Sequence, residues 1–223
     1  PLKKVSSVTG PLSINMNPGY RTIIEYWEGK ASKPSEAFAL QALMQLAENS
    51  KIENCVFQKD VIDAMFRQVQ GSGTIPFANH TLPGVIPGAE FDLGRNKAAY
   101  FDTDVANYQV STGTWTAWNT GGALRNDGVD IEPSGDSDGS PFSIGWIVDG
   151  EWLTYTADIR HSGSYDISFR IASPDGQGRI VLRLDDQTLV AELDVPDTGG
   201  WYNWQNVTVT DVELPAGEHT FKL

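Results

Sequence analysis

The chain has 223 residues, of which 40% are hydrophobic, and a formal net charge of −13; this composition supports a folded core and excludes wholesale disorder. The negative charge would repel phosphates, which excludes nucleic-acid binding driven by counterion release. The single cysteine, Cys55, excludes an internal disulfide, and no apolar run is long enough to span a bilayer.

The two ends of the sequence indicate a piece of a longer protein. The chain begins with PLKK, without an initiator methionine or a secretory leader, and it stops at HTFKL inside a strand-like pattern. The absence of a leader from such a piece carries no information about export of the parent protein. We therefore expect an internal fragment.

The first 70 residues are predicted to alternate strands and helices. TIIEYW (22–27) is a β-prone run bounded by Gly and Pro, which predicts a buried strand. A helical period follows in residues 35–50, a second β-prone run in 52–57, and helical spacing again in 61–69. This order predicts an α/β fragment. Its first helix, in residues 35–50, is expected to be buried by packing over most of its surface.

A linker and a β-sandwich are predicted to follow. Residues 71–82 lie in a segment rich in Gly and Pro with little periodicity, which is typical of a linker. In residues 83–223, hydrophobic side chains alternate with polar ones in short segments, and Asp-Gly, Gly-Gly and Pro-Ala-Gly turns lie among them. The chain is therefore predicted to be mainly β, with an antiparallel sandwich of the jelly-roll type.

The acidic residues are concentrated in the second part of the chain. Residues 1–80 contain 8 of the 16 basic and 7 of the 29 acidic residues, which leaves 8 basic and 22 acidic residues for the remainder. Such a surface disfavours polyanions and remains compatible with neutral glycans.

Four tryptophans occupy two strand-and-turn segments of the predicted sandwich. They are Trp146 and Trp152 in GWIVDGEWLTYTADI, and Trp201 and Trp204 in TGGWYNWQNVTV. Flat aromatic rings suit stacking on the apolar faces of sugars. Strand alternation directs Trp152 away from the core, since Leu153, Tyr155, Ala157 and Ile159 share the opposite face, and it would place Trp201 in the core.

Residues 83–223 resemble the family 6 carbohydrate-binding modules. The resemblance rests on GVDIE, GWIVDGEWLTY, FRIAS, VPDTGGWYNWQNVTV and LPAGEHTFKL, which occur in the family's order. It implies a β-sandwich attached to a polysaccharide-degrading enzyme, with a sugar cleft in the loops at one end. Carried over by motif, Trp146 and Trp201 clamp a sugar ring and Glu132 supplies a hydrogen bond, while Trp152 centres a second cleft on the sheet face.

Two further expectations come from this resemblance. A bulge after Gly199 and Gly200 would place Trp201 in the cleft despite strict alternation, with Trp204 packing inside. The family's cleft asparagine lies on a strand after HTFKL, which this chain lacks. We therefore expect weaker binding and lower stability than in the complete parent.

The resemblance also implies a structural calcium held by two glutamates near the start of the module. Aligning VIPGAEFDLG places Pro87 and Ala89 at those positions and leaves Glu90 as the nearest candidate ligand, with Asp92 close by. We expect no cofactor to be required.

The first part of the chain resembles the end of a retaining glycoside hydrolase barrel. The predicted strand 22–27 carries Glu25, the type of residue that closes the seventh strand as the nucleophile, and residues 1–70 would then supply the last two βα units. Its acid partner would lie upstream, so we expect no hydrolase activity from this chain. The open alternatives are an ordinary surface acid, a lyase-type β-helix rung in 50–57, and a small helical linker domain.

The sequence therefore predicts a module that binds a polysaccharide of the β-glucan, xylan or agarose type and targets a covalently linked, secreted hydrolase. The alternatives are a structural or adhesion β-sandwich and the targeting module of a polysaccharide lyase. No membrane insertion is expected.

Overall fold

The computed structural model describes residues 17–54, 57–105, 113–119 and 123–223. The chain divides into two compact units, Pro1–Gln58 and Lys59–Leu223. Each unit is described by itself.

The first unit is helical where it is described. It contains α2 (Pro18–Trp27), α3 (Glu36–Asn49) and a 3-10 turn (Ile52–Asn54). The side chain of Ser35 caps α3 by accepting a hydrogen bond from the Phe38 N–H at 3.2 Å, which confirms the helix predicted there. Ala42 is the buried residue of α3 and several large apolar side chains of this helix are exposed, so the expected packing over most of its surface is wrong.

The predicted strand 22–27 is instead the C-terminal half of α2. Asn17 caps this helix by accepting a hydrogen bond from the Tyr20 N–H at 2.9 Å, and Pro18 occupies the first turn. Both residues favour a helix start, and they outweigh the β-propensity of the two isoleucines. The strand predicted at 52–57 is also wrong for residues 52–54, which form the 3-10 turn. The side-chain Nδ2 of Asn54 donates a hydrogen bond to the Glu48 carbonyl at 2.8 Å. Cys55 lies outside the described residues.

The second unit contains the strands. They are β1 (His80–Leu82), β2 (Tyr100–Phe101), β3 (Ile131–Pro133), β4 (Phe142–Ile144), β5 (Trp152–Ile159), β6 (Gly163–Ile171), β7 (Arg179–Leu184), β8 (Gln187–Asp194), β9 (Gln205–Leu214) and β10 (Gly217–Lys222), with a 3-10 turn at Gly88–Glu90. One sheet has the order β1-β5-β10-β7-β8, with β2 also on β5, while β3-β4 and β6-β9 form two-stranded sheets. Among the strands that the structure describes, the ladders are antiparallel except that of β1 with β5, and an isolated bridge between Asn96 and Tyr100 of β2 is also parallel.

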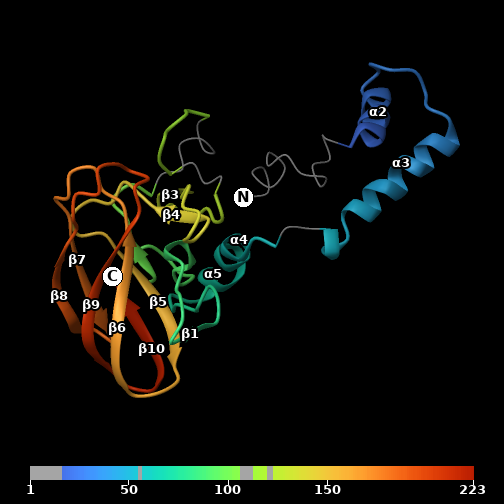
Figure 1. The fold of residues 1–223 in the computed structure, drawn as a ribbon. Coiled ribbons are helices and arrows are strands. Elements are labelled where there is room, and N and C mark those ends of the chain that lie inside the picture. Colours follow the sequence, from blue (N-terminus) through green and yellow to red (C-terminus); the bar gives the residue numbers. More distant parts are fainter. Residues whose placement is uncertain (1–16, 55–56, 106–112, 120–122) are drawn as a thin grey trace. The chain divides into compact units, whose positions relative to one another are not determined.

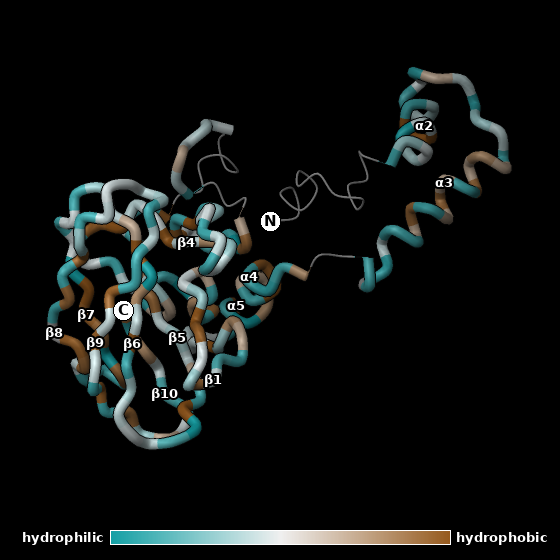
Figure 2. The backbone as a smooth tube through the Cα atoms, in the orientation of Figure 1, coloured by the Kyte–Doolittle hydropathy of each residue, from teal (hydrophilic) through white to brown (hydrophobic). Residues whose placement is uncertain are grey.

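The two layers face one another and enclose the core, which confirms the predicted sandwich. Figure 1 shows β6 and β9 in front of the layer that contains β5 and β10. Tyr155, Ile159, Leu182 and Phe221 from one layer and Leu214 from the other belong to one buried cluster. Along β7, exposed residues alternate with partly or fully buried ones, as the period-2 pattern requires. Figure 2 shows hydrophobic stretches in β7 and β8.

Residues 59–70 pack within the second unit, although the sequence grouped them with residues 1–58. They form α4 (Lys59–Ile62), a π-helical turn (Asp63–Arg67) and α5 (Gln68–Gln70). The Asp60 carboxylate accepts a hydrogen bond from the Asn126 N–H at 2.7 Å, and Arg67 donates to the Leu93 carbonyl at 3.1 Å. The assignment of residues 1–70 to an upstream catalytic domain, and the division at 71–82, stay predictions.

A fully buried arginine joins the irregular segments of the second unit. The Arg125 side chain has 0% exposure and pairs with Asp127. Its guanidinium also donates to the carbonyls of Phe91 and Asp92, and it lies 3.5 Å from the centre of the Phe91 ring. The Asp92 carboxylate in turn accepts hydrogen bonds from the Thr156 N–H and Oγ1, both at 2.9 Å. Arg125 therefore ties the segment before β3 to the central strand β5.

Replacing Arg125 should destabilise the second unit strongly. Arg125→Ala would strand a mostly buried Asp127 carboxylate and two backbone carbonyls, so we expect the free energy of unfolding to fall by about 3 kcal/mol or more. Arg179→Ala is the matched control, because Arg179 pairs with Glu192 on the surface at 3.0 Å and should cost less than about 1 kcal/mol. Urea unfolding measures both, and equal losses would contradict the role given to Arg125.

Candidate functional site

Trp146 lies in an exposed turn between β4 and β5. Its backbone adopts φ +50°, a left-handed conformation that is unfavourable for a bulky residue and therefore needs support from its surroundings. The support is visible: the Gly145 N–H donates to the Asp130 carbonyl at 3.0 Å, and the Val148 N–H donates to Glu151 Oε2 at 3.0 Å. The Trp146 side chain is left 42% exposed, beside exposed Ile147 and Val148.

Glu132 lies next to this turn. It belongs to β3, where it pairs with Ser143 of β4, and its Oε1 lies 3.7 Å from the position that a Cβ on Gly145 would take. Its other oxygen, Oε2, accepts a hydrogen bond from the Tyr202 hydroxyl at 3.1 Å. This hydrogen bond raises the pKa of Tyr202.

Trp201 and Tyr202 form a second exposed turn. Trp201 is 68% exposed, and the turn is closed by the Asn203 N–H, which donates to the Gly200 carbonyl at 3.2 Å. The strand β9 begins only at Gln205, so alternation does not extend to Trp201 and its placement in the core by strict alternation is wrong. A turn, rather than the expected bulge, is what exposes Trp201.

Trp204 anchors this turn. Its side chain is half-buried, and its indole Nε1–H donates to the Ser134 carbonyl at 2.9 Å. The expected packing role of Trp204 stays a prediction.

The structure thus gathers two aromatic turns around one carboxylate. Glu132 contacts Tyr202 directly and adjoins Gly145, the residue before Trp146. Sequence reasoning missed Tyr202, although its place between Trp201 and Trp204 was a usable signal. Exposed apolar side chains around a polar group are typical of a binding surface.

Trp152 lies elsewhere, on the outer face of the large sheet. Its neighbours on β5 confirm the predicted parity, since Tyr155, Ala157 and Ile159 are buried in the core. Lys222 Nζ sits 3.6 Å from the centre of the Trp152 ring and covers one of its faces. Stacking on that face would require Lys222 to move, which separates Trp152 from the freely exposed Trp146 and Trp201.

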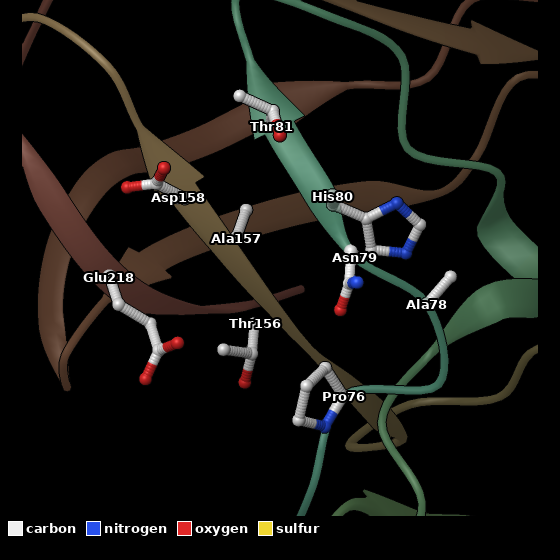
Figure 3. A pocket seen from close by; sticks show the side chains of 9 residues that line it. All are labelled: Pro76, Ala78, Asn79, His80, Thr81, Thr156, Ala157, Asp158 and Glu218. Atoms are coloured by element: carbon white, nitrogen blue, oxygen red, sulfur yellow. The ribbon is translucent and has the colours of Figure 1, made fainter.

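A shallow pocket of about 250 Å³ lies further along the sheet, between β1, β5 and β10. Figure 3 shows Thr156, Asp158 and Glu218 from β5 and β10 among the residues around it, together with Asn79 and Pro76 from the segment before β1. Asp158 and Glu218 are directly opposite in the ladder. This lining has no tryptophan, tyrosine or phenylalanine on which a sugar could stack.

Four acidic residues, Asp102, Asp104, Asp130 and Glu151, lie on segments near the Trp146 turn. Asp102 and Asp104 come from the loop after β2, Asp130 precedes β3, and Glu151 precedes β5. Burial, followed by the charges of Asp102, Glu151 and Asp104, raises the pKa of Asp130 to about 7. Burial also raises the pKa of Asp102 to about 6.

The residues expected near the start of the module do not form the calcium site that the family implies. Glu90 Oε2 faces His80 Nε2 at 3.7 Å, whereas both carboxylate oxygens of Asp92 are taken by Thr156. Within the described ranges, no three acidic, histidine or cysteine side chains converge on one metal position. Glu90 therefore lacks the partner that calcium coordination needs.

Glu25 is a half-exposed residue within α2. Arg21, one helical turn before it, pairs with its carboxylate at 3.4 Å. The argument that placed it at the end of a barrel strand is therefore wrong, because no strand is present there.

Comparison with known proteins identifies the second unit. The family model "Carbohydrate binding module (family 6)" matches residues 122–223. The C-terminal family 6 module of the laminarinase LamC from Zobellia galactanivorans is 38% identical over 42% of this chain and 74% of that one, with a TM-score of 0.38. This chain belongs to carbohydrate-binding module family 6.

Two further proteins are similar to this chain. A β-1,3-glucan-binding module from Bacillus halodurans is 34% identical over 43% of this chain and 71% of that one, with a TM-score of 0.37. An arabinoxylan arabinofuranohydrolase from Paenibacillus polymyxa is 35% identical over 43% of this chain and 16% of the enzyme. The chain spans only 11 to 16% of the length of the curated relatives it matches, so their activities belong to longer proteins. In the part of the chain that the structure describes, no helix is long and apolar enough to cross a membrane.

The contact between Glu132 and Tyr202 in this family 6 module can be tested without a ligand. Glu132→Gln removes the carboxylate that raises the Tyr202 pKa, so one tyrosine should titrate at lower pH than in the unaltered protein. Ultraviolet difference titration measures this ionisation, with Tyr202→Phe as the control that removes the signal. An unchanged titration in Glu132→Gln would show that the two turns do not meet as described.

Proposed function

We propose that this module binds a polysaccharide of the β-glucan or xylan type through the Trp146, Trp201 and Glu132 surface. The observation that carries the proposal is that two turns with exposed tryptophans flank one carboxylate. Indole faces supply contact area for pyranose rings, while Glu132 and the Tyr202 hydroxyl provide a polar edge that hydroxyl groups can bond.

Support for this ligand class comes from the family and from the electrostatics. Three relatives are a module of a laminarinase, a β-1,3-glucan-binding module and an arabinoxylan arabinofuranohydrolase. The net charge of −13 disfavours anionic polymers. Agarose, the third class suggested by the sequence, serves as a comparison in the test.

We also propose that the module targets a covalently linked glycoside hydrolase outside the cell. The curated arabinoxylan relative is a hydrolase of which the shared region makes up 16%. A short domain that recurs inside long enzymes, and whose exposed residues suit binding, fits a non-catalytic targeting role. Secretion and the upstream catalytic domain are parts of this proposal.

Trp146→Ala and Trp201→Ala test the binding surface. Each should weaken binding to laminarin or xylan about tenfold or more, because each removes a stacking platform worth about 1.4 kcal/mol or more. Trp27→Ala is the matched control, since Trp27 is 65% exposed but lies in α2 of the other unit, and should leave affinity unchanged. Calorimetry on β-glucan, xylan and agarose compares the four proteins.

Other outcomes would favour different functions. If Trp152→Ala abolishes binding and the two loop variants do not, the sheet face beside Lys222 is the site. If the folded chain binds none of the polysaccharides, the structural or adhesion alternative replaces the proposal.

A further inference from the structure

The outer face of the large sheet carries two cations that have no acidic partner among the described residues. Lys222 of β10 and Arg183 of β7 are directly opposite each other in the ladder. Both side chains point away from the core, because their neighbours Phe221 and Leu182 are buried in it. Neither cation forms an ion pair in the part of the chain that the structure describes. Like charges opposite each other on adjacent strands repel, so an anion placed between Lys222 and Arg183 would stabilise this part of the sheet.

Aromatic rings adjoin these cations on the same face. Lys222 Nζ lies 3.6 Å from the centre of the ring of Trp152, which is half-buried. Phe101 of β2 is directly opposite Trp152, and Lys97 Nζ lies 5.7 Å from the centre of the Phe101 ring. This end of the sheet face therefore offers flat apolar rings and ammonium groups side by side.

The acidic groups of the same face lie away from the cations. Asp158 and Glu218 are opposite each other at the far end of β5 and β10, and Glu218 is about 13 Å from Lys222 along the strand. Glu151, which precedes Trp152, already accepts hydrogen bonds from backbone N–H groups. The sheet face is therefore polarised, and its basic end can take an anionic ligand.

We propose that Lys222, Arg183 and Trp152 bind a uronic acid residue of a polysaccharide. The carboxylate of the uronic acid would pair with the Lys222 ammonium and the Arg183 guanidinium, both of which suit carboxylates. Lys222 would then leave the indole, and the apolar face of the sugar ring would take its place on Trp152. A neutral sugar must displace the same cation without giving it a new partner. The face therefore selects charged sugars over neutral ones, which separates it from the loop surface of Trp146 and Trp201.

The overall charge limits how many carboxylates the ligand can carry. At a net charge of −13, the protein repels a uniformly charged polyuronate. Screening confines the attraction of the two cations to about 10 Å at 0.1 M salt. The ligand class that meets both conditions is a neutral backbone with isolated uronic acid side groups, such as a xylan substituted with glucuronic acid. The inference adds this second site to the proposed function and does not depend on the loop surface.

Paired ligands test the charge. The full chain is titrated by calorimetry with a xylotetraose that carries one glucuronic acid, with the methyl ester of that acid, and with plain xylotetraose. At low salt the acid should bind about fivefold more tightly than its uncharged ester. The indole N–H resonance of Trp152 should shift with the acid and not with the ester. Addition of about 0.5 M NaCl should remove the advantage of the acid.

Substitutions locate the carboxylate. Lys222→Met keeps the apolar stem and should erase the advantage of the acid without weakening xylotetraose, because it uncovers the Trp152 ring. Arg183→Gln should reduce the same advantage, and it serves if the first variant fails to fold. Arg179→Gln is the matched control, since Arg179 shares the strand and the exposed face of Arg183 but pairs with Glu192 at 3.0 Å. It should leave the advantage unchanged.

Three results would overturn the proposal. They are equal affinities for acid and ester in the unaltered chain, an advantage of the acid that survives both Lys222→Met and Arg183→Gln, and its loss in Arg179→Gln alone. The loop surface is judged by its affinity for neutral sugars, and this site by the difference between acid and ester. Either can therefore fail while the other stands.

Discussion

The buried Arg125 guanidinium is the interaction on which the loop end of this module depends. The segments it connects contain little regular structure: Phe91 and Asp92 follow a 3-10 turn, and Asp127 lies three residues before Asp130. Such segments cannot satisfy their carbonyls by a strand ladder, so a side chain with five donors does it for them. Because Asp127 neutralises the charge and the Phe91 ring covers it, the cation is stable without water.

The segment that follows Arg125 leads into β3, which carries Glu132 of the candidate site. The chain that leaves Arg125 passes Gly128, where φ is +106° and a Cβ would meet the Val105 carbonyl oxygen at 2.9 Å. This close approach brings the loop after β2 against the start of β3, which places Asp102 beside Asp130 and directs Glu132 to the Trp146 turn. Repelling acids and a strained tryptophan are tolerated there because the surrounding core fixes the backbone.

The sequence predicted those features that depend on neighbouring residues. Its predictions failed where residues distant in the sequence determine the structure. The parity of β5 could be read from Leu153 to Ile159, because that strand has one buried face. Trp201 could not be placed by alternation, since β9 begins after it. The run TIIEYW favours a strand by its β-propensity, but the Asn17 cap and Pro18 start the helix α2 before it. The contacts of Arg125, Asp102 and Tyr202 join residues from about 30 to 70 positions apart, a distance that no sequence periodicity reports.

The most direct test of the central claim is nuclear magnetic resonance of the indole N–H groups of the seven tryptophans, assigned by single replacements, during titration with a laminarin oligosaccharide. If the loop end binds polysaccharide, the Trp146 and Trp201 signals should shift together and saturate at one concentration, while Trp27 and Trp152 stay in place. A saturable shift of Trp152 without Trp146 and Trp201 would contradict the account.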